Sequence, residues 1–274
     1  MSAVAVIARL EFSAATRQRW VRLFVLTFAL LSVVIASSAG AAEELSGPEG
    51  FSRTSVSLVP LALLLVPLAA LLLGVTGNAG EAGNEAYLFA QPVTRGEVIL
   101  GKWVGQLAAL SAAVALGLGA GGVFLAASAG LAGIERFLFV IVTSVVLGAV
   151  FLSLAAAITS AIPRRGTALG LASFVWFLFV LLYDGVALGV AGWSPGRTGA
   201  RVLFVSVFGN PADLARVLTL QLAGSPHVLG AAGEAWNRFL GGATPALVLA
   251  SVALLAWAAL PLAAAQRCLR RRDL

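Results

Sequence analysis

The sequence predicts an all-α integral membrane protein built as one transmembrane domain over residues 1–274. Hydrophobic residues make up 60% of the chain, charged residues only 11%, and the mean hydropathy is +0.99. A water-soluble domain of this size cannot bury so large an apolar fraction. Six stretches reach the roughly 20 residues that a helix needs to cross the hydrocarbon core of a bilayer. They are residues 20–40, 54–76, 103–127, 137–161, 167–191 and 244–264.

The basic residues indicate that both termini face the cytoplasm. Lys and Arg accumulate in the cytoplasmic loops of membrane proteins. With both ends inside, the tail 265–274 and most of the 18 basic residues are cytoplasmic. The arginines that remain outside are Arg53, Arg136, Arg197, Arg201, Arg216 and Arg238. The net charge of +6 is therefore a topology signal, and no separate basic domain indicates nucleic-acid binding. The preference for Arg over Lys, with abundant Ala and Gly, is typical of a GC-rich bacterial genome, so we expect the bacterial cytoplasmic (inner) membrane.

Residues 1–19 predict an amphipathic helix that lies on the cytoplasmic leaflet. Ile7, Leu10 and Ala14 share a helical face, and the arginines of this segment can reach anionic headgroups. A cleaved signal peptide is disfavoured because the segment before the first span is long and no clear cleavage site follows it. An ordinary basic flank of the first span is the alternative.

The polar segment 77–102, between the second and third spans, predicts a cytoplasmic loop with a short helix. Asn84 can cap a helix over Glu85–Ala90, and Pro92 ends it because the residue before a proline avoids the α region. The apolar side chains of this helix are Tyr87, Leu88 and Phe89. One interpretation is a helix that docks into a groove on a partner protein. The other is an ordered loop that lies on the bilayer surface. The residues alone favour neither.

The start of the third span carries a helix-capping signal. Thr94 and Glu97 have the spacing of a capping box, so a helix begins there and runs into the span. Gly96–Lys102 reads G-x-x-x-x-G-K, like a phosphate-binding loop. However, a tryptophan follows where a magnesium-binding Ser or Thr is needed, and no strand precedes it. We therefore interpret the motif as part of a helix.

Asp184 and the segment 192–243 are the polar features of the outer half. Asp184 is the one acidic residue that falls within a predicted span, and an ionisable group there is a functional candidate by default. Its place near the outer end of the span also allows a simple interfacial position. Asn210 followed by Pro and, at the third helical position, Asp213 predicts a capped helix in the extracytoplasmic segment. That helix could lie on the membrane or receive a periplasmic partner, which makes Asn210 and Asp213 candidate contacts.

The chain offers little chemistry of its own. It contains one Cys, one His and one Met, whereas a transition-metal pathway needs several soft or imidazole ligands. No nucleophile stands beside a recognisable base. We expect no catalytic, cofactor-binding or metal-binding site, and we expect the energy for any transport to come from another protein.

The segment Glu81–Lys102 resembles the permease subunits of ABC transporters of the type-2 exporter family. Acidic and small residues, a short apolar helix, then Gln-Pro-Val-Thr-Arg-Gly-Glu and Ile-Leu-Gly-Lys follow the family pattern, although Asn84-Glu85-Ala86 stands near the place of its usual Gly-Thr-Leu. Trp176–Asp184 and Asn210–Asp213 are similar to stretches of permeases that serve copper-site maturation of nitrous oxide reductase. With the amphipathic start and basic end, the likeness covers nearly the whole chain.

This resemblance implies a homodimer that works with two copies of a cytoplasmic ATPase, which binds the ATP and Mg²⁺. It also implies a periplasmic accessory protein. The residues expected to couple to the ATPase are Glu81, Glu85, Tyr87, Leu88, Phe89 and Arg95. The scarcity of metal ligands fits passage of a sulfur species, or transmission of motion, better than passage of copper. The alternatives are a general exporter of a lipid, drug or other substrate, and a membrane scaffold without ATP coupling.

Overall fold

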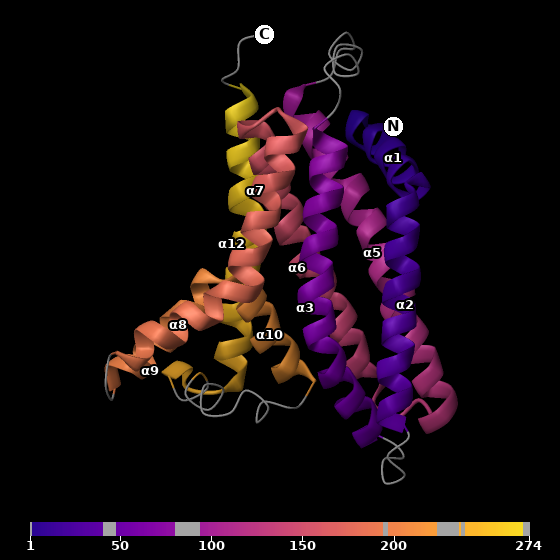
Figure 1. Cartoon of the computed structure of the whole chain (residues 1–274), viewed down its shortest axis with the longest axis vertical. Coiled ribbons are helices and arrows are strands. Elements are labelled where there is room, and N and C mark those ends of the chain that lie inside the picture. Colours follow the sequence, from indigo (N-terminus) through magenta and orange to yellow (C-terminus); the bar gives the residue numbers. More distant parts are fainter. Residues whose placement is uncertain are drawn as a thin grey trace.

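Within the part of the chain that the structure describes, six helices are long and apolar enough to cross a membrane, and they form the body of the protein (Figure 1). The computed structural model describes residues 2–40, 48–79, 94–193, 197–223, 236 and 239–270. The six spans are α2 (Arg19–Gly40), α3 (Pro48–Asn78), α5 (Arg95–Ala129), α6 (Ile134–Ala161), the run Arg165–Gly192, and α12 (Ala243–Arg270). The predicted fold class is confirmed.

The third span is longer than predicted because its helix begins at the capping box. Thr94 Oγ1 accepts from the Glu97 amide at 3.3 Å, and Glu97 Oε2 accepts from the Thr94 amide at 2.8 Å. These bonds satisfy two amides that the first turn of a helix leaves free. Gly96–Lys102 consequently lies in α5, as predicted, and forms no phosphate-binding loop.

The centre of the bundle is α6, which packs against α3, α5, α10 and α12. Its middle turns are buried almost without interruption, and Leu147, Val150 and Phe151 are each at most 1% exposed. Trp103 on α5 adds a polar link, since its Nε1 donates to Ser153 Oγ on α6 at 3.0 Å. Because α6 touches most other spans, it is the frame against which the other helices are positioned.

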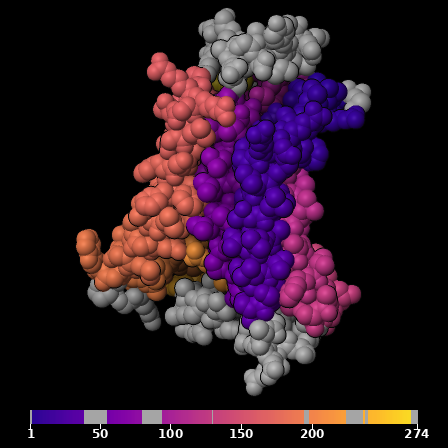
Figure 2. Space-filling view, turned by 45° about the vertical axis from the view of Figure 1, so that its right-hand side comes forward, coloured from indigo at the N-terminus to yellow at the C-terminus, as the bar shows by residue number. Residues whose placement is uncertain are grey.

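A close helix crossing joins α2 to α5. Ser32 Oγ donates to the Gly117 carbonyl at 2.7 Å and accepts from the Gly121 amide at 3.0 Å. A Cβ at Gly121 would lie 2.8 Å from the Ser32 carbonyl oxygen, so glycine is what allows this approach. Leu23 and Leu26 of α2 are exposed. The helix lies along one side of the molecule, where lipid tails can cover it (Figure 2).

The helix α1 (Ala3–Arg17) lies on α5, and its buried face differs from the predicted one. Ile7 and Ala15 are buried, whereas Leu10 is 62% exposed. Ile7 and Leu10 therefore face different surroundings, with Ile7 against the protein and Leu10 outward. The sequence pattern of α1 alone did not indicate this, because the seat for α1 is made by residues of α5.

The fifth span is not a uniform helix. It consists of α7 (Arg165–Phe177), one π-helical turn η1 (Leu178–Leu182) and α8 (Tyr183–Gly192). After η1 the chain turns away from the bundle (Figure 1). It then folds back as α9 (Arg197–Gly209), which contacts α8.

The helix α10 (Pro211–Leu222) enters the bundle instead of lying on its surface. It is bent by 100° from α9 and packs against α12, α6 and α3. Its buried residues are Pro211, Ala212, Asp213, Leu214, Ala215, Val217, Leu218, Thr219 and Leu220. The prediction of a helix free for the membrane or a partner is therefore wrong for most of its surface. The apolar stripe that suggested it is used for packing within the chain.

Candidate functional sites at the two ends of the bundle

Two groups of polar contacts lie at opposite ends of the bundle. We call one the α1 end, where α1, the end of α3, the start of α5 and the end of α12 come together (Figure 1). The other is the α9 end, where α8, α9 and the start of α10 meet (Figure 1). Of the predicted coupling residues, Arg95 belongs to the first group, and Asp184, Asn210 and Asp213 belong to the second.

At the α1 end, α5 holds the last turn of α3. Lys102 Nζ donates to the Gly77 carbonyl oxygen at 3.1 Å. The ammonium group thus satisfies a carbonyl that the end of a helix leaves free, and it complements the negative end of the helix dipole. One turn farther along α5, Gln106 Nε2 donates to Asn78 Oδ1 at 3.1 Å and to Glu11 Oε1 at 2.9 Å. The end of α3 is therefore fixed just before the segment that leads to α5.

Arg95, one of the predicted coupling residues, lies beside the end of α12. Its Nη1 donates to the Leu269 carbonyl oxygen at 2.7 Å. A cation at the C-terminal turn of a helix is favourable because carbonyl groups there carry partial negative charge. Arg95 thus ties the start of α5 to the last span. The other predicted coupling residues, Glu81, Glu85, Tyr87, Leu88 and Phe89, lie outside the described residues and stay predictions.

At the α9 end, Asp184 finds a partner on α10. Its Oδ2 lies 2.7 Å from Arg216 Nη1, and Asp213 Oδ1 lies 3.2 Å from the same nitrogen. The side chains of Asp184 and Arg216 are 39% and 38% exposed, and that of Asp213 only 13%. One guanidinium group therefore joins two carboxylates from α8 and α10. The sequence reasoning missed Arg216, although a carboxylate near the membrane needs a countercharge.

Asn210 connects the same helices through the π turn. Its Oδ1 accepts from the Ala212 amide at 3.0 Å, which is the predicted N-cap. Its Nδ2 donates to Asp213 Oδ2 at 3.0 Å and to the Phe179 carbonyl oxygen in η1 at 2.9 Å. A π turn interrupts the regular α-helical ladder, so an outside group can bond one of its carbonyls. Asn210 is 1% exposed, and any partner contact by it or Asp213 stays a prediction.

Replacing Asn210 tests whether the bond to the π turn matters beyond the cap. Asn210→Ala removes the cap and the bond to the π turn, and it is expected to lower the free energy of unfolding by about 1–2 kcal/mol. Asn210→Asp keeps a good cap but cannot donate to Phe179, and it places a second carboxylate beside Asp213. We expect it to be at least as destabilising as Asn210→Ala in thermal unfolding of the purified protein. Wild-type stability of Asn210→Asp would show that only the cap counts.

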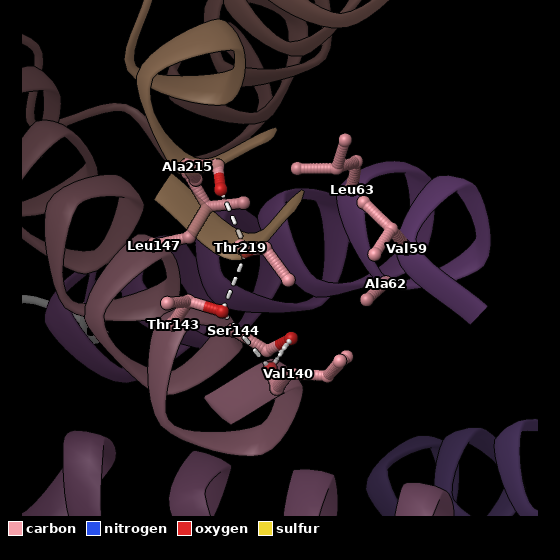
Figure 3. Close-up of a pocket in the computed structure, with 9 residues that line it drawn as sticks. All are labelled: Val59, Ala62, Leu63, Val140, Thr143, Ser144, Leu147, Ala215 and Thr219. Atoms are coloured by element: carbon pink, nitrogen blue, oxygen red, sulfur yellow. Dashed lines mark hydrogen bonds between the residues drawn. The ribbon is translucent and has the colours of Figure 1, made fainter. Parts of the chain in front are cut away.

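A small cavity lies where α10 meets α3 and α6 (Figure 3). Its volume is about 10 Å³, and Thr219 Oγ1 lies 2.7 Å from Thr143 Oγ1 at its wall. The two hydroxyl groups point toward each other, and Ser144 lies beside them (Figure 3). A cavity of this size holds about one water molecule. It is no substrate site, and it shows how closely α10 is seated.

Comparison with known proteins assigns the chain to a family. Residues 5–274 match the family described as "ABC-2 family transporter protein". The chain belongs to the ABC-2 family of transporter proteins. The family resemblance expected from the segment around Arg95 is thereby confirmed.

Two curated relatives of this ABC-2 protein carry the same description, "Probable ABC transporter permease protein NosY". The relative from Stutzerimonas stutzeri is 36% identical over 278 residues, which covers 97% of each chain. The relative from Pseudomonas aeruginosa is 35% identical over 286 residues and covers 100% of each. The chain is accordingly a multi-pass permease subunit of an ABC transporter.

In this ABC-2 permease, the two groups of polar contacts lie at opposite ends of the helix bundle. The α1 end brings together α1, the end of α3, the start of α5 and the end of α12. The α9 end joins the fifth span to the inserted helix α10 at the far side. Between them, α6 and its neighbours form a packed connection.

Proposed function

We propose that this permease couples ATP hydrolysis by a separate cytoplasmic ATPase to movement of its spans. The observation that supports this is the arrangement at the α1 end. Lys102 and Gln106 fix the end of α3, the capping box fixes the start of α5, and Arg95 reaches α12. A push on the segment between α3 and α5 then displaces helices, because the helix ends cannot simply fray. In this proposal the α1 end and both termini are cytoplasmic.

The nucleotide chemistry belongs to the partner in this proposal. ATP and Mg²⁺ bind to the ATPase subunit, and the permease holds no nucleotide, metal or other cofactor. The ATPase docks on the segment Glu85–Ala90, which the sequence predicts to be a helix, with Glu81, Glu85 and Arg95 as polar contacts and Tyr87, Leu88 and Phe89 as the apolar ones.

A second copy of the permease completes the proposed transporter. Two ATPase subunits act as a pair, so they need two permease chains. The face most in need of cover is that of η1 and α8, in which no residue is buried. Exposed apolar side chains on it include Leu181, Val186 and Leu188. We place the second copy against this face, with lipid covering α2.

The relatives' name points to a NosY-like role, in copper-site maturation of nitrous oxide reductase with a periplasmic accessory protein. The chain's single Cys and single His favour a sulfur species as cargo, or motion alone, over copper. The Asp184–Arg216 cluster lies where movement of the fifth span would reach the outer surface. A general exporter of lipids or drugs is the alternative for the cargo, and a scaffold without ATP coupling is the alternative for the mechanism.

Co-purification with the cytoplasmic ATPase subunit of the same transporter tests the proposal. Leu88→Arg places a charge in the proposed docking helix and is expected to abolish recovery of the ATPase with the tagged permease. The matched control is Leu131→Arg, since Leu131 is 66% exposed in the turn between α5 and α6 at the opposite end. The control should retain the ATPase, and both variants should elute as folded protein in gel filtration.

Two results would count against this proposal. Failure of wild-type permease to bind the ATPase would favour the scaffold. Binding without stimulation of ATP hydrolysis by the permease would do the same. Retention of the ATPase by Leu88→Arg would instead move the docking site away from Glu85–Ala90.

A further inference from the structure

Gln106 stands where three helices of the α1 end meet. It is 0% exposed, and its Nε2 donates to Glu11 Oε1 on α1 and to Asn78 Oδ1 on α3. We infer that Gln106 is a positioning residue that makes α1, α3 and α5 move as one body when the ATPase acts on the segment between α3 and α5. This inference rests on the proposed coupling to an ATPase and names the residue through which the movement reaches α1.

The seat of α1 on α5 is made by glycines. A Cβ at Gly101 would lie 2.7 Å from Ile7 Cβ, and a Cβ at Gly105 would lie 2.8 Å from Glu11 Cβ. These separations are shorter than side-chain carbons tolerate, so only glycine permits the approach. The close seat brings the Glu11 carboxylate to Gln106, which directly follows Gly105 in the chain.

The end of α3 also reaches this place, and we call the meeting point of Gln106, Glu11 and Asn78 the junction. A Cβ added to Gly77 would collide with both Gln106 Nε2 and Glu11 Oε1. The bond from Gln106 to Glu11 has a carboxylate acceptor, and such charge-assisted bonds are stronger than those between neutral groups. With Lys102 bound to the Gly77 carbonyl, the last turn of α3 is held at two successive turns of α5.

Packing alone does not explain a glutamine at this position. Its Oε1 is buried and has no hydrogen-bond partner among the described residues. A buried acceptor without a partner is costly, and a leucine would fill a similar space without that cost. The two bonds from Nε2, to two different helices, account for the amide. Gln106 therefore gives the protein a connection at some expense in stability.

Movement of α1 has a short route to the first span. Only Gln18 separates α1 from α2. The Gln18 amide donates to the Ala15 carbonyl at 3.1 Å, and Trp20 Nε1 donates to Gln18 Oε1 at 2.5 Å, so the turn is braced from both sides. A displacement passed from Gln106 to Glu11 would accordingly tilt α2 against α5.

The test compares binding of the ATPase with its stimulation, in the full complex reconstituted in lipid nanodiscs. Gln106→Leu and Glu11→Ala are expected to retain the ATPase but to lose most of its permease-dependent stimulation, by about five-fold or more. Glu11→Gln keeps an acceptor oxygen for Gln106 and should retain stimulation. Trp103→Phe is the matched control, because it removes one partly buried hydrogen bond between α5 and α6 outside the junction.

The outcomes separate the inference from the proposed function. Wild-type stimulation by Gln106→Leu, or an equal loss in Trp103→Phe, would overturn the inference. If even the wild type gives no stimulation, the proposed function fails. The joint movement of α1 and α5 is then tested without the ATPase. Spin labels are attached at Leu10→Cys on α1 and Leu116→Cys on α5 in a Cys268→Ser background, and the distribution of distances between them is measured by double electron–electron resonance. A distribution that broadens in Gln106→Leu but not in Trp103→Phe supports the joint movement, and an unchanged one overturns it.

Discussion

Gly105→Val is expected to detach α1 from the bundle and to uncouple the permease from its ATPase. A Cβ at this position runs into the Ala8 carbonyl and lies 2.8 Å from Glu11 Cβ, and the added methyl groups increase the overlap. Because a backbone carbonyl cannot turn aside as a flexible side chain can, α1 must move. Overpacking of this kind costs about 3 kcal/mol.

Labelling of a buried cysteine measures this detachment. Ala15 lies on the buried face of α1 and is 1% exposed, so Ala15→Cys should react slowly with a maleimide in a Cys268→Ser background. A cost of about 3 kcal/mol to the docked state raises the labelling rate by about 100-fold. Gly119→Val is the matched control on the same helix, since nothing lies within 4 Å of a Cβ there. Equal labelling of the two variants would show that α1 is not seated on Gly105.

Arg216→Met is expected to be the most damaging change at the α9 end. It leaves the carboxylates of Asp184 and Asp213 facing each other without the cation that holds them. Breaking a buried ion pair costs about 3–5 kcal/mol, and an exposed pair contributes about 1 kcal/mol or less. Because Asp213 is largely buried while Asp184 and Arg216 are more than a third exposed, we expect a loss of about 2 kcal/mol. Asp184→Asn should cost less, because Arg216 keeps its bond to Asp213. Thermal unfolding of the purified protein measures both.

A double variant makes this prediction specific. Adding Asp184→Asn to Arg216→Met removes one of the two opposed carboxylates, so the pair should be less destabilising than the sum of the single changes. Arg201→Met on α9 removes an exposed arginine nearby and should leave the melting temperature unchanged. If Arg201→Met were as harmful as Arg216→Met, net charge would explain the loss, and the cluster would not.

Local signals in the sequence predicted much of this fold. Hydropathy located all six spans, because about 20 apolar residues are needed to cross a bilayer. The Thr94–Glu97 box and the Asn210 cap were found because capping depends on residues within one turn. Contacts between distant helices are harder to predict. The glycine seat of α1 depends on Gly101 and Gly105 of α5 meeting another helix. Gly101 was interpreted only as part of the G-x-x-x-x-G-K motif, and the G-x-x-x-G spacing of the two glycines indicates a close helix approach without identifying the partner helix.

The partner of Asp184 could have been found from charge balance. Arg216 was counted among the external arginines, yet it stands three residues after Asp213 on a predicted helix. A cation placed beside one acidic residue and near a membrane carboxylate is a natural countercharge. What the sequence could not supply was the 100° bend between α9 and α10, which brings Arg216 back to the fifth span.

The π turn at Leu178–Leu182 also sets the rotational phase of the fifth span. A π turn holds about one residue more than an α turn, and one residue corresponds to about 100° of rotation around a helix axis. The residues of α8 are therefore turned relative to the stripe that α7 presents to α3. Asp184 is the second residue after the turn and meets Arg216 in that shifted phase. If η1 changed to an ordinary α-helix, Asp184 would rotate away from Arg216. A change in the helix type of η1 would therefore break the contact that ties the fifth span to α10.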